Sequence, residues 1–236
     1  MIGDTFPDPW LLIADADETL LGDDVALRSL WASCQAAGVW IVVNSSRPID
    51  SVEPDIPAWL DPLGIIGAMG TEIVLDGTYV ESWPVRFGSW DRSLAHRALA
   101  AEGFEPHHDE FQAEFKVSFA VPPSGLERAR TAIESTSLPC RIIESGESDF
   151  DVIPRGAGKR AAAEFVAFRL SATPDRVATA GDSLNDLDML SFGHGIVVGN
   201  ASRDLLARAA SLGISPTSAH RARGVLEGLR HLGAVA

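Results

Sequence analysis

The sequence has little cysteine and no long apolar run. Its 236 residues include only two cysteines, Cys34 and Cys140, which fall in different predicted elements. So few cysteines cannot form the disulfide framework of a small secreted domain. Since the N-terminus does not resemble a signal peptide, we expect both thiols to be reduced in a cytoplasmic protein. No apolar run approaches the length of a membrane span, so we expect no membrane partner.

Positive charge is also scarce. Lys and Arg number 19 against 33 Asp and Glu, which gives a formal net charge of −14 at pH 7. A chain this acidic is a poor ligand for nucleic acid or an anionic membrane, so we expect neither as a partner. An anionic substrate would need a local cation, which favours a bound metal. The only lysines are Lys116 and Lys159; unless this is chance, each indicates a site that needs a compact ammonium group.

Strand and helix patterns alternate in the first and last thirds of the chain. Short apolar runs bounded by turn residues predict buried strands, and apolar residues at helical spacing predict helices between them. We expect strands at 11–14, 39–43, 64–68, 176–180 and 195–199, a hairpin at 69–77, helices at 24–38 and 159–171, and two C-terminal helices. This alternation is typical of a parallel sheet with helices on both faces.

The middle third has a different pattern. We expect a helix ending at Gly103, a strand at 114–121 with one solvated face, a helix beginning at Pro122-Pro123, and strands at 141–144 and 149–153. Short strands with antiparallel character predict a small α+β domain. The predicted organisation is an α/β fold with a Rossmann-like parallel-sheet core, residues 1–78 and 158–236, and an inserted α+β domain, residues 79–157. Asp76-Gly77 and residues 154–158 are suited to hinges.

Two aspartates follow the first predicted strand. Asp15 and Asp17 come directly after the apolar run Leu11–Ala14. In open α/β sheets the carboxyl ends of the strands form the ligand-binding edge, so both carboxylates are positioned to act on a bound group. If the chain turns at Ala16, one carboxylate can attack as a nucleophile while the other transfers a proton. The alternative is a loop whose aspartates only stabilise a turn and begin a helix.

Polar residues also follow other elements of the core. The second strand is followed by Asn44-Ser45-Ser46-Arg47, which would suit either a helix cap or an anion site. Lys159 begins a predicted helix. Asp182 and Asp186 lie one helical turn apart after a later strand, where they could also be acids of a first helical turn. Together with Asp15 they offer the oxygen ligands that Mg²⁺ prefers, so we expect a Mg²⁺ site.

These motifs in this order resemble those of the haloacid dehalogenase-like (HAD) superfamily. The matching residues are Asp15-x-Asp17-x-Thr19, Ser45 before Arg47, Lys159, and Gly181-Asp182-x-x-Asn185-Asp186. The position of the insertion is similar to that of the branch with a large α/β cap. Within that branch, three segments of the chain resemble the sucrose-phosphate phosphatase group. They are Gly70-Thr71-Glu72-Ile73, Phe115-Lys116-Val117-Ser118, and Asp151-Val152-Ile153-Pro154 through Gly158-Lys159. The chain departs from the superfamily at Glu18, where glycine is common, and at Ser45-Ser46-Arg47, which replaces Thr-Gly-Arg.

The resemblance implies hydrolysis of a phosphomonoester through an aspartyl-phosphate on Asp15. It implies that Asp17 protonates the leaving oxygen and then activates water. The residues implied to bind the phosphoryl group are Ser45, Ser46, Arg47 and Lys159. The residues implied to bind Mg²⁺ are Asp15, Asp17 through its backbone carbonyl, Asp182 and Asp186. The departure at Ser45-Ser46-Arg47 therefore affects contacts to phosphate or sugar.

The inserted domain indicates the kind of substrate. Between Tyr79 and Ala157 the chain carries 8 basic and 13 acidic side chains, a balance that suits a neutral sugar body better than a polyphosphate. Lys116 lies on a strand that could face the core, and we expect it to contact sugar hydroxyls, with Asn185 as a second candidate. The alternative for Lys116 is a surface lysine. The expected partner is a small phosphorylated sugar, and the expected assembly is a monomer or a small homo-oligomer.

Other functions fit the same residues. By the same resemblance, related caps serve phosphosugar mutases and phosphatases of trehalose phosphate or of glycosyl-glycerate phosphates. A different class is the phospho-accepting receiver domain, which combines an aspartate, a hydroxyl and a lysine at strand ends but signals instead of turning over. Asp17 argues against a receiver, because a second carboxylate beside the nucleophile speeds loss of the phosphoryl group.

Overall fold

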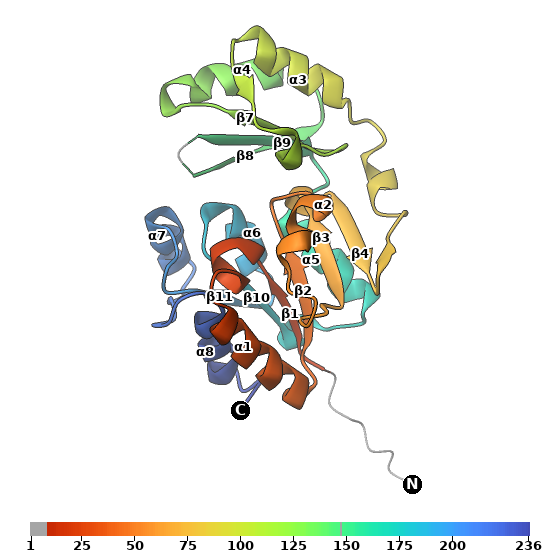
Figure 1. Cartoon of the computed structure of the whole chain (residues 1–236). Coiled ribbons are helices and arrows are strands. Elements are labelled where there is room, and N and C mark those ends of the chain that lie inside the picture. Colours follow the sequence, from red (N-terminus) through yellow and green to blue (C-terminus); the bar gives the residue numbers. More distant parts are fainter. Residues whose placement is uncertain (1–8, 147) are drawn as a thin grey trace.

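The larger of two sheets forms the centre of the molecule. The computed structural model describes residues 9–146 and 148–236. The start of the predicted core segment and the N-terminus, which we expected not to be a signal peptide, lie in residues 1–8, outside the described residues. The order in the larger sheet is β11-β10-β1-β2-β3-β4-β5 (Figure 1). The strands from β11 to β3 in this order are parallel to one another. At one edge of the sheet, β4 pairs antiparallel with β3, and β5 pairs antiparallel with β4. Their bounds are β1 (Leu11–Ala14), β2 (Trp40–Asn44), β3 (Gly64–Gly67), β4 (Glu72–Leu75), β5 (Thr78–Tyr79), β10 (Val177–Gly181) and β11 (His194–Val197).

Helices connect the strands and cover the sheets. The α-helices are α1 (Asp24–Ala37), α2 (Ile49–Val52), α3 (Arg92–Ala101), α4 (Leu126–Ser135), α5 (Lys159–Arg169), α6 (Leu187–Leu190), α7 (Arg203–Ser211) and α8 (Arg221–His231). Shorter helical segments are η1 (Ala16–Leu20), η2 (Glu53–Asp55), η3 (Ala68–Gly70), η4 (Pro84–Phe87), η5 (Asp109–Phe111), η6 (Pro123–Gly125), η7 (Pro174–Arg176) and η8 (Leu184–Asp186). Within the described residues, no helix has both the length and the apolar character needed to cross a bilayer.

Strand β1 lies in the middle of the larger sheet and is buried on both faces. Its four residues have no exposed surface, and successive side chains point to opposite faces. Leu12 and Ala14 pack in the core formed with α1 and α8, whereas Leu11 and Ile13 pack in the core formed with α5. Burial on both faces explains why this strand is a continuous apolar run. The predicted Rossmann-like core is confirmed.

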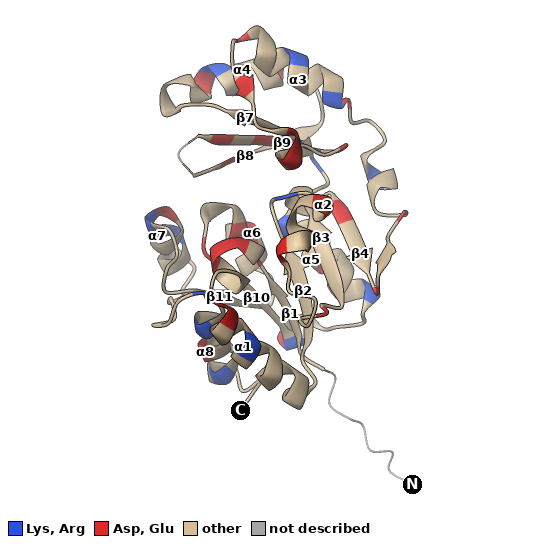
Figure 2. Ribbon diagram, viewed as in Figure 1, with Lys and Arg blue, Asp and Glu red and all other residues tan. Residues whose placement is uncertain are grey.

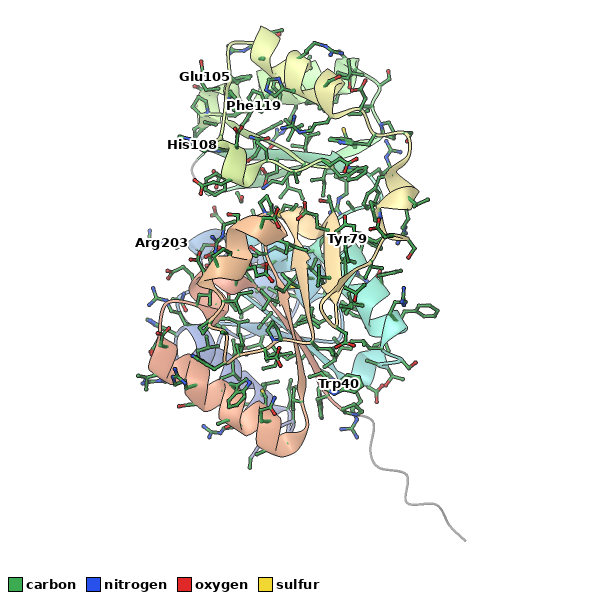
Figure 3. The ribbon with its side chains drawn as sticks, turned by 45° about the vertical axis from the view of Figure 1, so that its right-hand side comes forward. Trp40, Tyr79, Glu105, His108, Phe119 and Arg203 are labelled. Carbon is green, nitrogen blue, oxygen red and sulfur yellow. The ribbon has the colours of Figure 1, made fainter. Side chains whose placement is uncertain are left out.

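The smaller sheet belongs to the inserted domain. It is antiparallel, with the order β6-β7-β9-β8, and its bounds are β6 (Glu105–Pro106), β7 (Val117–Ala120), β8 (Cys140–Ser145) and β9 (Asp149–Pro154). Helices α3 and α4 cover one face (Figure 1), where Phe119 (labelled in Figure 3) and its neighbour Phe150 are fully buried. The other face is turned toward the carboxyl ends of the core strands (Figure 1). The predicted α+β cap is therefore present above the edge expected to carry the site.

Three predicted details differ from the structure. Asp76-Gly77, expected as a hinge, is the turn between β4 and β5 of the core sheet, and Tyr79, expected at the start of the cap, pairs with Val74 in that sheet (Figure 3). The strand predicted at 114–121 is shorter, because Ala113 and Lys116 exchange two backbone hydrogen bonds of 3.3 Å in a turn before β7. The remaining domain boundaries stay a prediction.

Candidate active site

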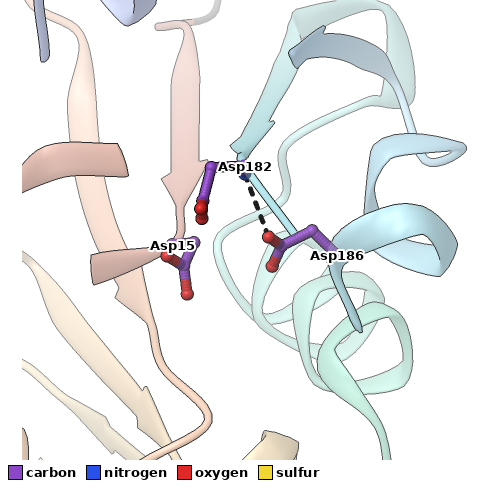
Figure 4. A group of neighbouring side chains, drawn as sticks. All are labelled: Asp15, Asp182 and Asp186. Carbon is purple, nitrogen blue, oxygen red and sulfur yellow. Dashed lines mark hydrogen bonds between the residues drawn. The ribbon is translucent and has the colours of Figure 1, made fainter. Parts of the chain in front are cut away.

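The carboxyl ends of two central strands bring three aspartates together. Asp15 follows β1, and Asp182 follows the adjacent parallel strand β10, so both reach the same edge of the sheet. Asp186 ends the turn that begins after Asp182. One carboxylate oxygen from each of the three lies within 4.8 Å of the others (Figure 4). The grouping expected from the strand ends is therefore present.

Lys159 reaches these carboxylates from the first turn of α5. Its Nζ donates to Oδ1 of Asp15 and to Oδ1 of Asp186, both at 2.6 Å, and its side chain is 2% exposed. The preceding Gly158 has φ of 136°, in the region that favours glycine. A Cβ on Gly70 would lie 2.3 Å from the carbonyl oxygen of Gly158, so glycine is needed there too. Two glycines thus allow the start of α5 to approach the site.

Asp186 is fully buried and orients its neighbours. Its Oδ2 accepts a hydrogen bond from the backbone N–H of Asp182 (Figure 4) and another from that of Ser183, both at 3.1 Å. Its Oδ1 accepts from Lys159. A Cβ on Gly181 would lie 2.5 Å from the Asp186 side chain, so the glycine permits this approach. Asp186 therefore holds both the lysine and the loop that carries Asp182.

Two further polar residues tie the site together. Thr19 donates from Oγ1 to Oδ1 of Asp182 at 3.2 Å. Asn44 is fully buried at the end of β2 and donates from Nδ2 to the backbone carbonyl of Lys159 at 3.0 Å. The sequence alone did not indicate a separate function for Asn44. The signal that could have identified it is an amide at the buried end of a strand, where a partner is obligatory.

The electrostatics of this group favour a bound cation. Burial raises the pKa of the Asp15 carboxyl to about 8; Lys159 opposes the increase and Asp186 adds to it. Burial and the charge of Asp186 raise the pKa of Asp182 to about 6. Burial lowers the pKa of Lys159, but Asp15 and Asp186 raise it by more, so the ammonium stays charged. One ammonium does not neutralise three carboxylates, and a cluster of oxygen donors with raised pKa values fits a divalent cation such as Mg²⁺.

Acidic residues extend beyond this cluster. Figure 2 shows Asp and Glu on the core segments that face the cap, around α2 and α6, and on the cap strands above them. An anionic substrate approaching such a surface is repelled unless positive charge lies in the site itself. The Lys159 ammonium and a cation held by the three aspartates are therefore the groups that would attract phosphate to this edge of the sheet.

Arg47 pairs with Asp17. Its Nε and Nη2 donate to the two carboxylate oxygens of Asp17, both at 2.9 Å, and its Nη1 donates to Asp55 at 2.8 Å. Fork-shaped pairing of this kind fixes both side chains in one orientation. The structure thus gives Arg47 carboxylate partners, and its expected contact with phosphate stays a prediction.

The other predicted phosphate ligands lie in the same loop. Ser45 is fully buried, and its Oγ accepts from the backbone N–H of Arg47 at 3.0 Å. Ser46 is half-buried, and its carbonyl oxygen accepts from Lys116. Asn185 accepts from the Ser183 hydroxyl at 3.0 Å. Their roles in binding phosphate or substrate stay predictions.

Lys116 is buried between the cap and the core. It is 2% exposed, so the alternative of a surface lysine is wrong. Its Nζ donates to the Ser46 carbonyl at 2.9 Å and lies 3.3 Å from Oδ2 of Asp151, which is 3% exposed. A cavity of about 250 Å³ opens beside these groups; it is lined by Ser46, His107, Phe111, Lys116, Ser118, Ser145, Asp149 and Asp151. Asp151 is a cap residue that belongs to one of the motifs above but whose function the sequence did not indicate.

Comparison with known proteins identifies the family. The model of the sucrose-6F-phosphate phosphohydrolase family matches residues 8–233. The chain belongs to this family. As a member it is a phosphoric monoester hydrolase, which confirms the resemblance to the sucrose-phosphate phosphatase group drawn from the motifs.

Relatives with known names and solved structures agree with this assignment. The mannosylfructose-phosphate phosphatase of Agrobacterium fabrum (strain C58 / ATCC 33970) is 29% identical over 242 residues, which cover 94% of this chain and 96% of the relative. The probable sucrose-phosphatase 3a of Arabidopsis thaliana is 27% identical, covering 85% of this chain and 53% of the relative, so the chain spans about half the length of that plant protein. The sucrose-phosphatase of Synechocystis sp. PCC6803, solved in complex with sucrose and phosphate, shares the fold with a TM-score of 0.87 at 23% identity, covering 96% of this chain and 99% of that one.

Proposed function

We propose that this family member is a Mg²⁺-dependent phosphatase that hydrolyses a sugar phosphate through an aspartyl-phosphate on Asp15. The observation that carries the proposal is the buried group in which Asp15 contacts Lys159 beside Asp182 and Asp186. A carboxylate held between an ammonium and a cation site is suited to attack phosphorus. Both positive groups would reduce its repulsion from the phosphate oxygens.

The proposed reaction has two steps. In the first, an oxygen of Asp15 bonds to phosphorus while the bond from phosphorus to the sugar oxygen breaks, and Asp17 gives that oxygen its proton. Lys159 and the Ser45 hydroxyl donate hydrogen bonds to the phosphoryl oxygens. In the second, Asp17 takes a proton from a water whose oxygen bonds to phosphorus, and Asp15 leaves as a free carboxylate with inorganic phosphate as the product.

The residues that would hold Mg²⁺ are Asp15, the backbone carbonyl of Asp17, Asp182 and Asp186. When bound, Mg²⁺ would supply positive charge beside the phosphoryl group. The carboxylate of Asp17 accepts a hydrogen bond from Arg47 at each of its two oxygens, and each oxygen keeps a second lone pair that can carry a proton.

The cap cavity supports a sugar as the leaving group. Oδ1 of Asp151 is buried and has no hydrogen-bond partner among the described residues. A sugar hydroxyl can donate to this oxygen and accept from Lys116 nearby, which satisfies both buried groups. Relatives are named for mannosylfructose phosphate and for sucrose phosphate, so we propose the phosphate ester of a disaccharide as the substrate.

A phosphate-release screen tests this function. The purified chain with Mg²⁺ would be assayed on phosphate esters of sucrose, mannosylfructose, trehalose and glycosyl-glycerate, with glucose 6-phosphate and a polyphosphate for comparison. We expect the highest kcat/KM for sucrose phosphate or mannosylfructose phosphate. Isomerised sugar phosphate without free phosphate would indicate a mutase. A phosphorylated protein that persists for hours without turnover would indicate a receiver.

We expect Lys116→Ala to lower kcat/KM for the best sugar phosphate about tenfold or more. The reason is that a hydrogen bond from a charged donor contributes about 1.5–3 kcal/mol and a tenfold change corresponds to about 1.4 kcal/mol. Steady-state phosphate release would measure it, with p-nitrophenyl phosphate as a substrate that has no sugar. Arg97→Ala, which removes an exposed cation from the cap, is the matched control. An unchanged kcat/KM in Lys116→Ala would remove this lysine from the substrate site.

We expect Mg²⁺ to raise the melting temperature more at pH 8 than at pH 6. The raised pKa values of Asp15 and Asp182 mean that the folded, metal-free protein binds more protons than the unfolded chain, so its stability falls as the pH rises from about 4 to 8. Mg²⁺ competes with these protons, and at a hundred times its Kd it adds about 2.7 kcal/mol, or roughly 5–10 °C. Thermal unfolding in EDTA and in Mg²⁺ would measure both effects, and Asp182→Asn is expected to remove most of the gain. An equal or larger gain at pH 6 would contradict the assignment.

A further inference from the structure

The turn that carries Asp17 contains a residue in an unfavourable backbone conformation. Glu18 has φ of 61° and ψ of −2°, in the left-handed region that glycine occupies without strain. This is the position at which the chain departs from the glycine common in the superfamily. A glutamate here needs some other interaction to keep the turn in place.

Arg221, the first residue of α8, supplies that interaction from the far end of the chain. Its Nη2 donates to both carboxylate oxygens of Glu18, at 2.9 and 2.7 Å, and its Nε donates to Oε2 at 3.1 Å. Its Nη1 donates to the carbonyl oxygen of Gly22 at 3.1 Å, just beyond the turn. One guanidinium therefore holds both the turn and Gly22, which lies shortly after the turn ends.

Asn200 completes the arrangement through the backbone. Its Nδ2 donates to the carbonyl oxygen of Glu18 at 2.8 Å, and its Oδ1 accepts from the backbone N–H of Arg221 at 2.8 Å. Arg221 itself has φ of 51°, so both ends of the ion pair are held in a backbone conformation that an L residue rarely adopts. An ordinary surface ion pair shows no such constraint on the main chain.

The turn connects directly to the reacting groups. Glu18 follows Asp17, the expected acid, and precedes Thr19, which donates to Asp182. A change in the backbone at Glu18 would therefore move the acid and loosen a contact to the cation site together. We propose that Arg221 is a positioning residue for the phosphatase reaction, acting through Glu18 to hold the turn that carries Asp17. This inference rests on the proposed function.

A double-mutant cycle between Arg221 and Glu18 tests the inference. We expect Arg221→Ala to lower kcat for p-nitrophenyl phosphate with Mg²⁺ about tenfold while KM changes less than twofold, and Arg221→Lys to recover part of the loss. In the Glu18→Gly background the turn needs no compensation, so we expect Arg221→Ala to cost less than twofold. Arg223→Ala, which removes an exposed arginine from the same helix, is the matched control.

The outcomes separate the inference from the proposed function. If the parent chain does not hydrolyse p-nitrophenyl phosphate or any sugar phosphate, the proposed function fails. If the parent is active but Arg221→Ala behaves like Arg223→Ala, only the inference fails. A lower melting temperature with unchanged kcat would show that Arg221 is merely structural, and an equal loss of kcat in both backgrounds would show that it does not act through Glu18; either result overturns the inference.

Discussion

Asp15→Asn is expected to lower kcat about a thousandfold or more while the protein stays folded. The amide keeps the shape of the side chain but cannot form the phosphoryl ester, and loss of a covalent nucleophile commonly has the largest effect of any single substitution at a site. Folding should persist because burial already disfavours the charged form of Asp15, and Lys159 keeps Asp186 as a partner. Phosphate release from p-nitrophenyl phosphate and from the best sugar phosphate, with Mg²⁺, would measure the loss.

The control for this substitution is Asp24→Asn, which neutralises an exposed aspartate in the first turn of α1. Its kcat should stay within twofold of the parent, and both variants should melt cooperatively. A folded Asp15→Asn protein with near-parental hydrolysis would show that Asp15 is not the nucleophile. The proposed reaction would then have to be abandoned.

The parts of the fold that were predictable from sequence are those whose own residues carry the pattern. Strand β1 is a continuous apolar run because it is buried on both faces, and α1 ends at Ala37 just before Gly38, whose φ of 69° suits the residue after a helix. The two-residue strands β5 and β6 have no such pattern, because they are strands only through their pairing with a neighbouring strand. For the same reason Asp76-Gly77 was correctly expected to turn but wrongly expected to separate two domains.

The candidate site was predictable where position along an element decides position in space. Asp15 and Asp182 lie at the ends of adjacent parallel strands and Lys159 begins a helix, so topology alone brings them to one edge. The partners of side chains are not decided in this way. Nothing in the order of residues indicates that Arg47 pairs with both carboxylate oxygens of Asp17. The burial of Lys116 depends on how the cap packs over Ser46.

Residues that depart from a pattern were informative only after the structure was known. Glu18 departs from the glycine common in the superfamily, and the sequence offers no sign of what compensates for it. Arg221 lies 203 positions away and reaches Glu18 because α8 packs beside α1 and the turn η1. An interaction between residues so far apart in the chain cannot be predicted from local sequence, because it depends on how α8 is positioned against α1 and η1.

Asp17→Asn is expected to trap the phosphorylated enzyme. With p-nitrophenyl phosphate the leaving group needs no proton, so Asp15 can still be phosphorylated, but the asparagine cannot activate water for the second step. We expect a burst of p-nitrophenol equal in amount to the enzyme, followed by turnover reduced about a hundredfold to ten-thousandfold. Intact-protein mass spectrometry should show one added phosphoryl group, and the combination Asp15→Asn with Asp17→Asn should show none.

The matched control is Asp55→Asn, because Asp55 is the other exposed carboxylate that accepts from Arg47. It should keep multiple turnover and show no trapped phosphate, since it lies outside the proposed proton path. If Asp17→Asn instead turns over like Asp55→Asn, Asp17 does not transfer protons in either step. If it gives neither a burst nor turnover while its fold and its response to Mg²⁺ are intact, the second carboxylate is needed before phosphorylation, and the two-step assignment of Asp17 is wrong. A burst with a trapped phosphoryl group also separates this chain from a receiver, because the parent then loses its phosphate only through the carboxylate that the variant lacks.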